Sequence, residues 1–287
     1  VVCDIFPVQS QHVHSSSIVE CPNGDWLAVW FQGSGERSAN DGKVNGARLR
    51  QGASSWSEVF QAADTPGFPD CNPVLFLDRN QKLWLFWCRV LANRWECGQL
   101  MCRSATEYSQ DGPPQWSWQE CIVFDPGDSF VGALEDGFNK LDIGRGMWGE
   151  YALPYSRLMV DAAKDPYKRQ TGWMTRIHPV QLPSGRMLLP LYSDGFNLSL
   201  VALSDDDGVT WRPSMPIVGA GPVQPSIVRK NDGALVAYMR DGGDAPPRVL
   251  KAESSDEGET WSPARDTDIP NPGSSLAVIR PRDGRWV

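Results

Sequence analysis

Short apolar runs joined by small polar turns recur along the chain. In each copy a polar lead precedes an apolar run, a turn of two to four polar residues usually contains Gly, and a second apolar run follows. This is the pattern of a β-hairpin, because Gly readily adopts the positive φ that a tight Asn-Gly or Asp-Gly turn requires. The five copies begin near Ile18, Val74, Val180, Ile227 and Ala277.

The spacing of these hairpins predicts a repeat fold. Successive copies are 56, 106, 47 and 50 residues apart. A repeat of this length with two hairpins per unit is typical of the four-stranded blades of a β-propeller. The 106-residue step requires either a further blade that the pattern does not reveal or an insertion.

We therefore expect a single all-β domain over residues 1–287. Residues 125–172 interrupt the strand alternation and are partly helical in pattern. We interpret this segment as an insertion over one face, since long loops in compact domains are usually functional. A divergent blade is the alternative.

A second motif, S-x-D-x-G-x-T-W, occurs at residues 204–211 and 254–261, and a partial match to it occurs at 109–116. The two full copies follow Val180 and Ile227 by 24 and 27 residues. We expect Asp206 and Asp256 to close a turn between the outer two strands of a blade, with Gly at positive φ and Trp packed between sheets. These carboxylates are therefore predicted to be structural rather than catalytic.

This motif is the Asp-box, or BNR repeat, of the sialidase (neuraminidase) superfamily, which the chain resembles. It is most similar to a bacterial branch with a His-led first strand. The segments that carry the resemblance are His14-Ser15-Ser16-Ser17, Gly33-Ser34-Gly35-Glu36, Asn72-Pro73-Val74-Leu75-Phe76, Gln224-Pro225-Ser226-Ile227 and Asn271-Pro272-Gly273-Ser274. The resemblance implies a six-bladed β-propeller of four-stranded antiparallel blades. It also implies a glycoside hydrolase that acts on terminal sugars of glycans, such as an exo-sialidase.

The end of the chain also bears on the fold. Aligning Gly284 with Gly24 places Val287 inside the second strand of a blade. A propeller that ended there would have an unpaired edge strand, which is costly. We therefore expect the domain to be incomplete at Val287, with the nucleophilic Tyr that sialidases use lying beyond it.

Candidate site residues lie just before the first strand or just after the second strand of each hairpin, because these positions converge on one face of a propeller. Carboxyl and imidazole groups can protonate a leaving oxygen or activate water, and Arg can hold an anionic sugar. The candidate catalytic residues are His14, Glu36, Asp41 and Asp194. The candidate substrate-binding residues are Asn72, Arg89, Arg176, His178, Tyr192, Gln224 and Arg240.

One departure from the sialidase pattern affects the substrate. Sialidases typically open the first blade with Arg-Ile-Pro, and His14-Ser15-Ser16-Ser17 stands in its place. One of the three Arg residues that hold the sialic acid carboxylate is then missing, so uronic acids and deoxy sugars are alternative substrates. A polysaccharide lyase and a non-catalytic glycan-binding propeller are the alternative functions on the same scaffold.

The amino-acid composition bears on the partners, membrane spans, disulfides and metals that the protein is expected to have. The net charge is −8 with charges of both signs interspersed, and there is no apolar run long enough to span a membrane; we therefore expect neither a nucleic-acid partner nor a membrane span. The seven cysteines cannot all pair within the chain, and only three His are present. We expect buried thiols, with one or two disulfides if the protein is exported to the periplasm or outside the cell, and no metal or cofactor. The expected partner is a glycan, and the oligomeric state stays open.

Overall fold

The computed structural model describes residues 4–141, 147–243, 247–280 and 285–287. Side chains are described for all of these residues except 147–153. The chain divides into two compact units, Val1–Ile122 and Val123–Val287. Each unit is described by itself below.

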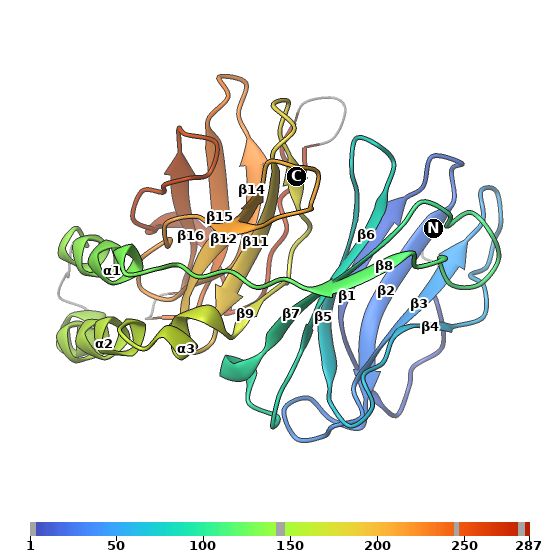
Figure 1. Cartoon of the computed structure of the whole chain (residues 1–287), viewed down its shortest axis with the longest axis horizontal. Helices are drawn as coiled ribbons and strands as arrows, with labels where there is room; N and C mark the ends of the chain where they lie inside the picture. The colour runs from blue at the N-terminus through green and yellow to red at the C-terminus, as the bar shows by residue number, and fades with distance from the viewer. Residues whose placement is uncertain (1–3, 142–146, 244–246, 281–284) are drawn as a thin grey trace. The chain divides into compact units, whose positions relative to one another are not determined.

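The first unit contains two four-stranded antiparallel sheets in sequential order (Figure 1). One consists of β1 (His12–Glu20), β2 (Trp26–Gly33), β3 (Lys43–Leu49) and β4 (Phe60–Ala63). The other consists of β5 (Asp70–Leu77), β6 (Leu83–Arg89), β7 (Gln99–Ala105) and β8 (Trp118–Cys121), with a 3₁₀ turn η1 (Trp95–Cys97) between β6 and β7. This up-and-down order is that of propeller blades.

The second unit contains two further antiparallel sheets. In the first, β9 (Trp173–Met174) and β10 (Val180–Gln181) both pair with β11 (Met187–Ser193), followed by β12 (Leu198–Ser204) and β13 (Arg212–Pro213). The other has the order β14 (Pro222–Arg229), β15 (Leu235–Asp241), β16 (Arg248–Ser254) and β17 (Arg265–Pro270). The hairpins predicted at Ile18, Val74, Val180 and Ile227 are thus confirmed as the first two strands of four sheets.

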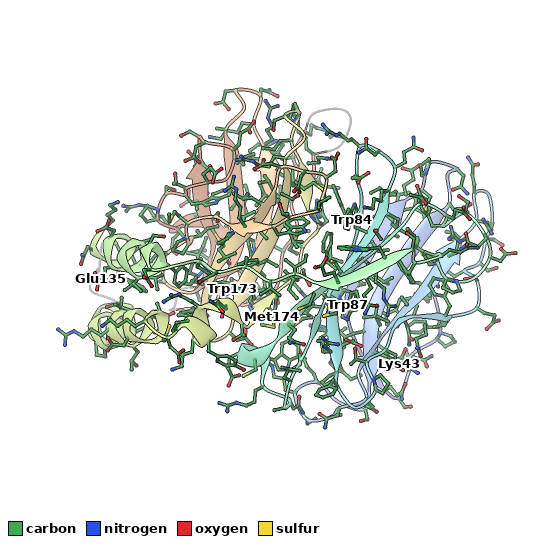
Figure 2. The ribbon with its side chains drawn as sticks, viewed as in Figure 1. Lys43, Trp84, Trp87, Glu135, Trp173 and Met174 are labelled. Atoms are coloured by element: carbon green, nitrogen blue, oxygen red, sulfur yellow. The ribbon has the colours of Figure 1, made fainter. Side chains whose placement is uncertain are left out.

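Three helices precede these sheets in the second unit: α1 (Ser129–Asn139), α2 (Met147–Ala163) and α3 (Pro166–Gln170). In α1 the residues Phe130, Leu134 and Phe138 are buried at the i, i+4, i+8 spacing of one helix face, while Glu135 is exposed (Figure 2). Phe130 packs edge-on against Trp173 of β9, with ring centroids 6.1 Å apart. The helical pattern read in 125–172 is confirmed, and its interpretation as an insertion over one face stays a prediction.

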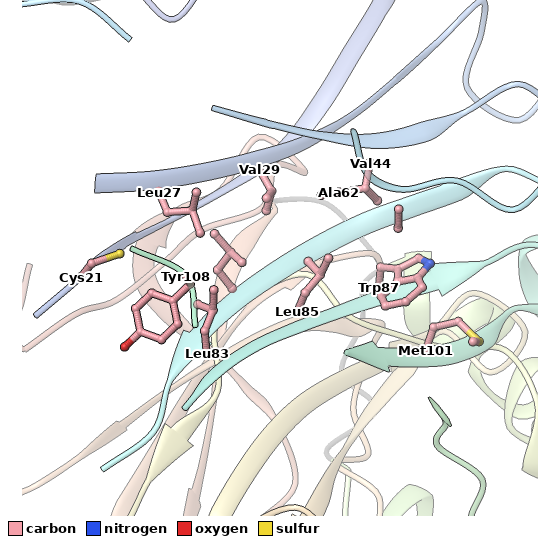
Figure 3. Close-up of a cluster of buried hydrophobic side chains, with 12 residues drawn as sticks. Cys21, Leu27, Val29, Val44, Ala62, Leu83, Leu85, Trp87, Met101 and Tyr108 are labelled. Atoms are coloured by element: carbon pink, nitrogen blue, oxygen red, sulfur yellow. The ribbon is translucent and has the colours of Figure 1, made fainter. Parts of the chain in front are cut away.

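Each unit has its own apolar core, built from the inward faces of its strands. In the first unit Leu27, Val29, Leu85 and Trp87 belong to one buried cluster with residues of β3, β4 and β7 (Figure 3). The second unit has an equivalent cluster of residues from β11, β12 and β14 to β16. Packing of apolar strand faces of this kind is the main stabilising term of such sheets.

The two full Asp-boxes form the predicted turns, between β12 and β13 and between β16 and β17. In the second, Asp256 accepts hydrogen bonds from Ser254 Oγ at 2.7 Å, Thr260 N at 3.0 Å and Thr260 Oγ1 at 2.5 Å. Gly258 has a φ of +88°, and the preceding Glu257 has a φ of +54°. The carboxylate therefore closes its own turn, as expected.

The expectation of six blades is wrong, because the described residues form four blades. The described part of the 106-residue step between Val74 and Val180 contains β6 to β9 and three helices rather than a further sheet. In the fifth repeat, Ile279 and Val287 exchange backbone hydrogen bonds of 2.9 and 3.0 Å, while its turn at Asp283-Gly284 lies outside the described residues. The spacing of hairpins in the sequence indicates that blades are present, but their number follows only from which strands are hydrogen-bonded to one another.

Of the seven cysteines, Cys3 lies outside the described residues, and none of the other six is joined in a disulfide in the described part of the chain. Burial raises the pKa of the Cys102 thiol to about 12, which keeps it protonated and unreactive at neutral pH. Among the helices of the described chain, none has the length and hydropathy needed to cross a bilayer.

Candidate active site

The first strands of three sheets carry the same β-bulge, at the end of each sheet where the candidate residues lie. The register shifts at His14/Ser17 in β1, at Cys71/Val74 in β5 and at Val223/Ser226 in β14. The first bulged residue is Ser15, Asn72 or Gln224, with φ of 56°, 51° and 58°. A bulge residue in this left-handed region is ordinarily Gly. A side chain there costs about 1–2 kcal/mol, which suggests that the side chain itself is needed.

Several polar atoms around these bulges are buried without a partner among the described residues. They are Ser15 Oγ, Gln224 Oε1 and Arg240 Nε. Arg240 lies opposite Val223, directly beside the bulge of β14. Buried polar groups in proteins are nearly always hydrogen-bonded, so orphaned ones at a strained position indicate a place for water or a ligand.

In the first unit, a histidine pair and a carboxylate gather at this end of β1. His12 Nε2 lies 3.6 Å from Glu36 Oε2, and each side chain is 32% exposed. The rings of His12 and His14 are 5.6 Å apart, and they pack against Phe31 of β2 at 5.6 and 5.8 Å. Residues i and i+2 of a strand lie on the same face, which is why both imidazoles reach one place.

The loop between β2 and β3 that carries Glu36 is held closed by Asp41. Its Oδ1 accepts hydrogen bonds from Ser34 N and Ser34 Oγ, both at 3.0 Å. These bonds, the backbone one foremost, lower the pKa of the exposed Asp41 carboxyl. A Cβ at Gly33 would lie 2.9 Å from Asp41 Oδ1, so the closed loop requires Gly there.

The start of β5 meets the same loop. Burial, together with the Asp70 and Glu36 carboxylates, raises the pKa of Cys71 to about 12, so Glu36 is close enough to influence β5. Asn72 follows and is 2% exposed. Asp70, which directly precedes Cys71, is fully buried. Burial raises the pKa of the Asp70 carboxyl despite a 2.7 Å hydrogen bond from Trp87 Nε1.

Arg89 ends β6 opposite Asp70. Its Nε and Nη2 donate to Gln99 Oε1 at 3.1 and 2.8 Å. The first unit thus brings five candidates to one end of its sheets, by the direction of the strands that carry them: His14, Glu36, Asp41, Asn72 and Arg89.

The second unit brings its own candidates to the corresponding end of its sheets. Tyr192 is the penultimate residue of β11 and is buried, and Asp194 directly follows that strand and is exposed. Arg176 and His178 lie between β9 and β10, where the seven residues from Met174 to Val180 face the five residues from Leu188 to Tyr192 of β11. The residues that the second unit assembles are Arg176, His178, Tyr192, Asp194, Gln224 and Arg240.

His178 occupies the place in its sheet that Asn72 and Gln224 occupy in theirs, since each is followed by Pro before the strand continues. Desolvation lowers the pKa of the His178 imidazole, so it is neutral at neutral pH. In that form it can accept a hydrogen bond from a sugar hydroxyl.

Sequence reasoning missed His12 and Ser15. The alternation of His12 and His14 was a visible signal, because a His-x-His pair in a strand places both rings on one side. Ser15 carried no such signal, since its importance depends on a bulge whose position only the paired backbone reveals.

The sequence profile of the BNR repeat-like domain matches residues 24–141 and 170–287. The chain belongs to this family. The match includes both full Asp-boxes and leaves out 142–169, which contains α2. Every candidate residue except His14 lies within the BNR repeat-like segments.

Comparison with individual proteins gives the wider relationship. Over 110 residues the BNR repeat-like chain is 33% identical to an anhydrosialidase from Macrobdella decora. The matched region covers 36% of this chain and 14% of that protein. Its fold is similar to that of a protein of unknown function from Dyadobacter fermentans, with a TM-score of 0.69 and 14% identity over 99% of this chain and 76% of the other. The Hadza microbial sialidase Hz136 gives a TM-score of 0.64 and 14% identity over 96% of this chain and 52% of the other. The fold is therefore that of the sialidase-like superfamily, and the chain spans about half the length of this sialidase.

Proposed function

We propose that the protein is a glycoside hydrolase of sialidase-like type that removes terminal sugars from glycans. The observation that carries the proposal is the His12–Glu36 pair, with 3.6 Å between Nε2 and Oε2, beside the strained bulge at Ser15. A carboxyl group beside an imidazole at a partly exposed end of a rigid sheet is a suitable acid–base pair for glycoside cleavage.

In this mechanism Glu36 protonates the glycosidic oxygen as the C–O bond breaks, and the resulting carboxylate then takes a proton from water. The water oxygen adds to the anomeric carbon, so one sugar hydroxyl and one free alcohol are formed. His12 stabilises Glu36 when it is ionised and orients its carboxyl group. Asp41, whose lowered pKa keeps it charged, would favour positive charge developing at the anomeric carbon.

The substrate-binding roles are proposed within each unit. In the first unit Ser15 and Asn72 would bind sugar hydroxyls. In the second, the partnerless atoms Gln224 Oε1 and Arg240 Nε would do so, and Arg176 would pair with an anionic group. A buried acceptor and a buried donor suit a hydroxyl group, which can serve both.

Sialosides are the first substrates to test, because the leech relative is named an anhydrosialidase and a structural neighbour a sialidase. We propose in addition that His14 marks a His-led branch, in which a uronic acid or a deoxy sugar replaces sialic acid as the terminal sugar. The support is that β1 offers two imidazoles where the sialidase pattern has an Arg.

The experiment is a hydrolysis screen with 4-methylumbelliferyl glycosides of N-acetylneuraminic acid, rhamnose and glucuronic acid. Release of fluorophore that is lost in Glu36→Gln supports the hydrolase. An unsaturated uronate product absorbing in the ultraviolet would instead identify a lyase. Saturable glycan binding without turnover would identify a binding module. Either of the last two results overturns the proposal.

A further inference from the structure

A pocket of about 370 Å³ lies at the far end of the first unit from His12 and Glu36. Its walls are β3, the β3–β4 loop and the β7–β8 loop, through Arg48, Arg50, Ser55, Trp56, Glu58 and Asp111. β3 runs from the Glu36 loop to this pocket over seven residues, roughly 20 Å at about 3.3 Å per residue. The pocket is thus separate from the candidate active site and has the size of a small-molecule site.

Two buried donors in its wall have no partner among the described residues, namely Trp56 Nε1 and Arg48 Nε. Arg48 is 2% exposed, and its other nitrogens are used: Nη1 donates to Asp25 Oδ2 at 3.4 Å and Nη2 to Tyr108 O. Donors of this kind are rarely left unsatisfied in a folded protein. Both residues line the pocket, so a small movement of the side chains that cover these two atoms would let acceptor oxygens of a bound molecule satisfy them.

The β3–β4 loop is the structural counterpart of an Asp-box turn that has lost the box sequence. Ser57 N donates to Arg48 O at 2.7 Å, and Ser57 Oγ accepts from Arg48 N at 3.0 Å. After the intact box, Ser262 N donates to Glu253 O at 2.9 Å, and Ser262 Oγ accepts from Glu253 N at 3.0 Å. The same pair of bonds thus follows both turns.

This equivalence makes Trp56 the counterpart of Trp261, since each directly precedes the matched serine. In the second of the two full Asp-boxes, at 254–261, Trp261 Nε1 donates to Gly258 O at 3.1 Å, so that turn satisfies its own indole. The β3–β4 loop offers Trp56 no such carbonyl. Trp56 therefore lines the pocket with an indole N–H that its own turn does not satisfy.

The charges around the pocket identify the class of ligand. Arg50 Nη1 donates to Asp25 Oδ2 at 2.6 Å and Nη2 bonds Asp111 Oδ1, so its charge is already neutralised. Glu58 adds a further carboxylate to the rim. An anion would meet this negative charge, whereas sugar hydroxyls can both accept from Arg48 and donate to the carboxylates. The indole supplies a flat apolar surface for a ring face.

We propose that this pocket is a second, non-catalytic carbohydrate site that binds a neutral sugar residue. It is independent of the hydrolase proposal. Such a site would hold a glycan to the protein at a point away from the His12–Glu36 pair.

The test uses ¹⁵N-labelled protein and neutral methyl glycosides of galactose, glucose, mannose and N-acetylglucosamine as probes, with glucuronic acid as the anionic comparison. The Trp56 indole resonance is assigned by its loss in Trp56→Phe. At least one neutral glycoside should shift it saturably. Ligand-observed relaxation should show affinity weakened at least tenfold in Trp56→Phe and unchanged in the matched variant Trp261→Phe.

Glu36→Gln separates the two proposals, because it should lose hydrolysis and keep this binding. The second-site proposal is overturned if no neutral glycoside shifts the Trp56 resonance in folded protein, or if glucuronic acid alone shifts it. It is also overturned if Trp261→Phe weakens binding as much as Trp56→Phe does.

Discussion

His12 begins β1 and Glu36 lies in the loop after β2, yet their side chains approach to 3.6 Å. The hairpin brings them together, because β2 returns antiparallel along β1 and ends opposite its start, with Gly33 paired to His12. Asp41 then closes the loop onto this end through Ser34. The pair is therefore positioned by the β1–β2 hairpin, and the Glu36 loop is also contacted by Trp95, which stacks on Arg37 at 4.2 Å.

Replacing Glu36 by Gln should lower kcat at least about 100-fold, the usual size of a general acid–base contribution. KM should change little, because the amide keeps the shape and most contacts of the side chain. Glu107→Gln is the matched control, since Glu107 is an exposed carboxylate of the β7–β8 connection. Steady-state kinetics of both variants decide the matter, and equal rates for Glu36→Gln and wild type would exclude Glu36 as the acid.

Replacing Gln224 by Gly should lower the affinity for substrate without lowering the stability of the fold. Gln224 has a φ of 58°, and Gly removes a strain of about 1 kcal/mol at such a position, so the free energy of unfolding should not fall. Affinity for substrate should fall at least tenfold, because the side chain that presents Oε1 is gone. Urea denaturation and substrate titration measure the two quantities. Gln224→Ala, which keeps the Cβ strain of the wild type, should lose affinity without the gain in stability that Gly brings.

Asp256→Ala should destabilise the second unit by about 1–3 kcal/mol, because the turn loses the acceptor of three hydrogen bonds. Turnover at saturating substrate should be unchanged at temperatures where the variant is folded. Ser255→Ala in the same exposed turn is the control and should leave stability within about 0.5 kcal/mol of wild type. A loss of kcat in folded Asp256→Ala would contradict a structural role.

His178 should make the protein less stable in mild acid. Desolvation lowers its pKa in the folded state below the ordinary 6.5, so the unfolded chain binds the proton first. The stability contributed by neutral His178 is therefore present above pH 6.5 and is lost as pH falls through the folded-state pKa. Unfolding free energies of wild type and His178→Gln at pH 7 and 5.5 measure this. The difference between the two proteins should shrink or change sign in acid, while exposed His14→Gln should follow wild type.

The local elements of this protein were predictable because their signals lie within a few residues. Asn-Gly and Asp-Gly turns between apolar runs identified four hairpins, and the Asp-box identified turns in which Asp256 bonds only its own neighbours. The ends of these hairpins also indicated where site residues would lie. Glu36 and Asp41 were predicted in this way, and their roles stay predictions.

The tertiary structure decided the number of blades, the register of the paired strands and the backbone strain at the bulges. The count of four blades depends on which strands pair over long distances. The segments Ser129–Asn139, Met147–Ala163 and Pro166–Gln170 pair with no strand, since they form helices. The bulges at Ser15, Asn72 and Gln224 arise from a one-residue mismatch between paired strands, which a single strand does not display. Sequence by itself determined the repeating unit through local turn chemistry, while the site and the second pocket depend on backbone pairing between segments distant in the chain.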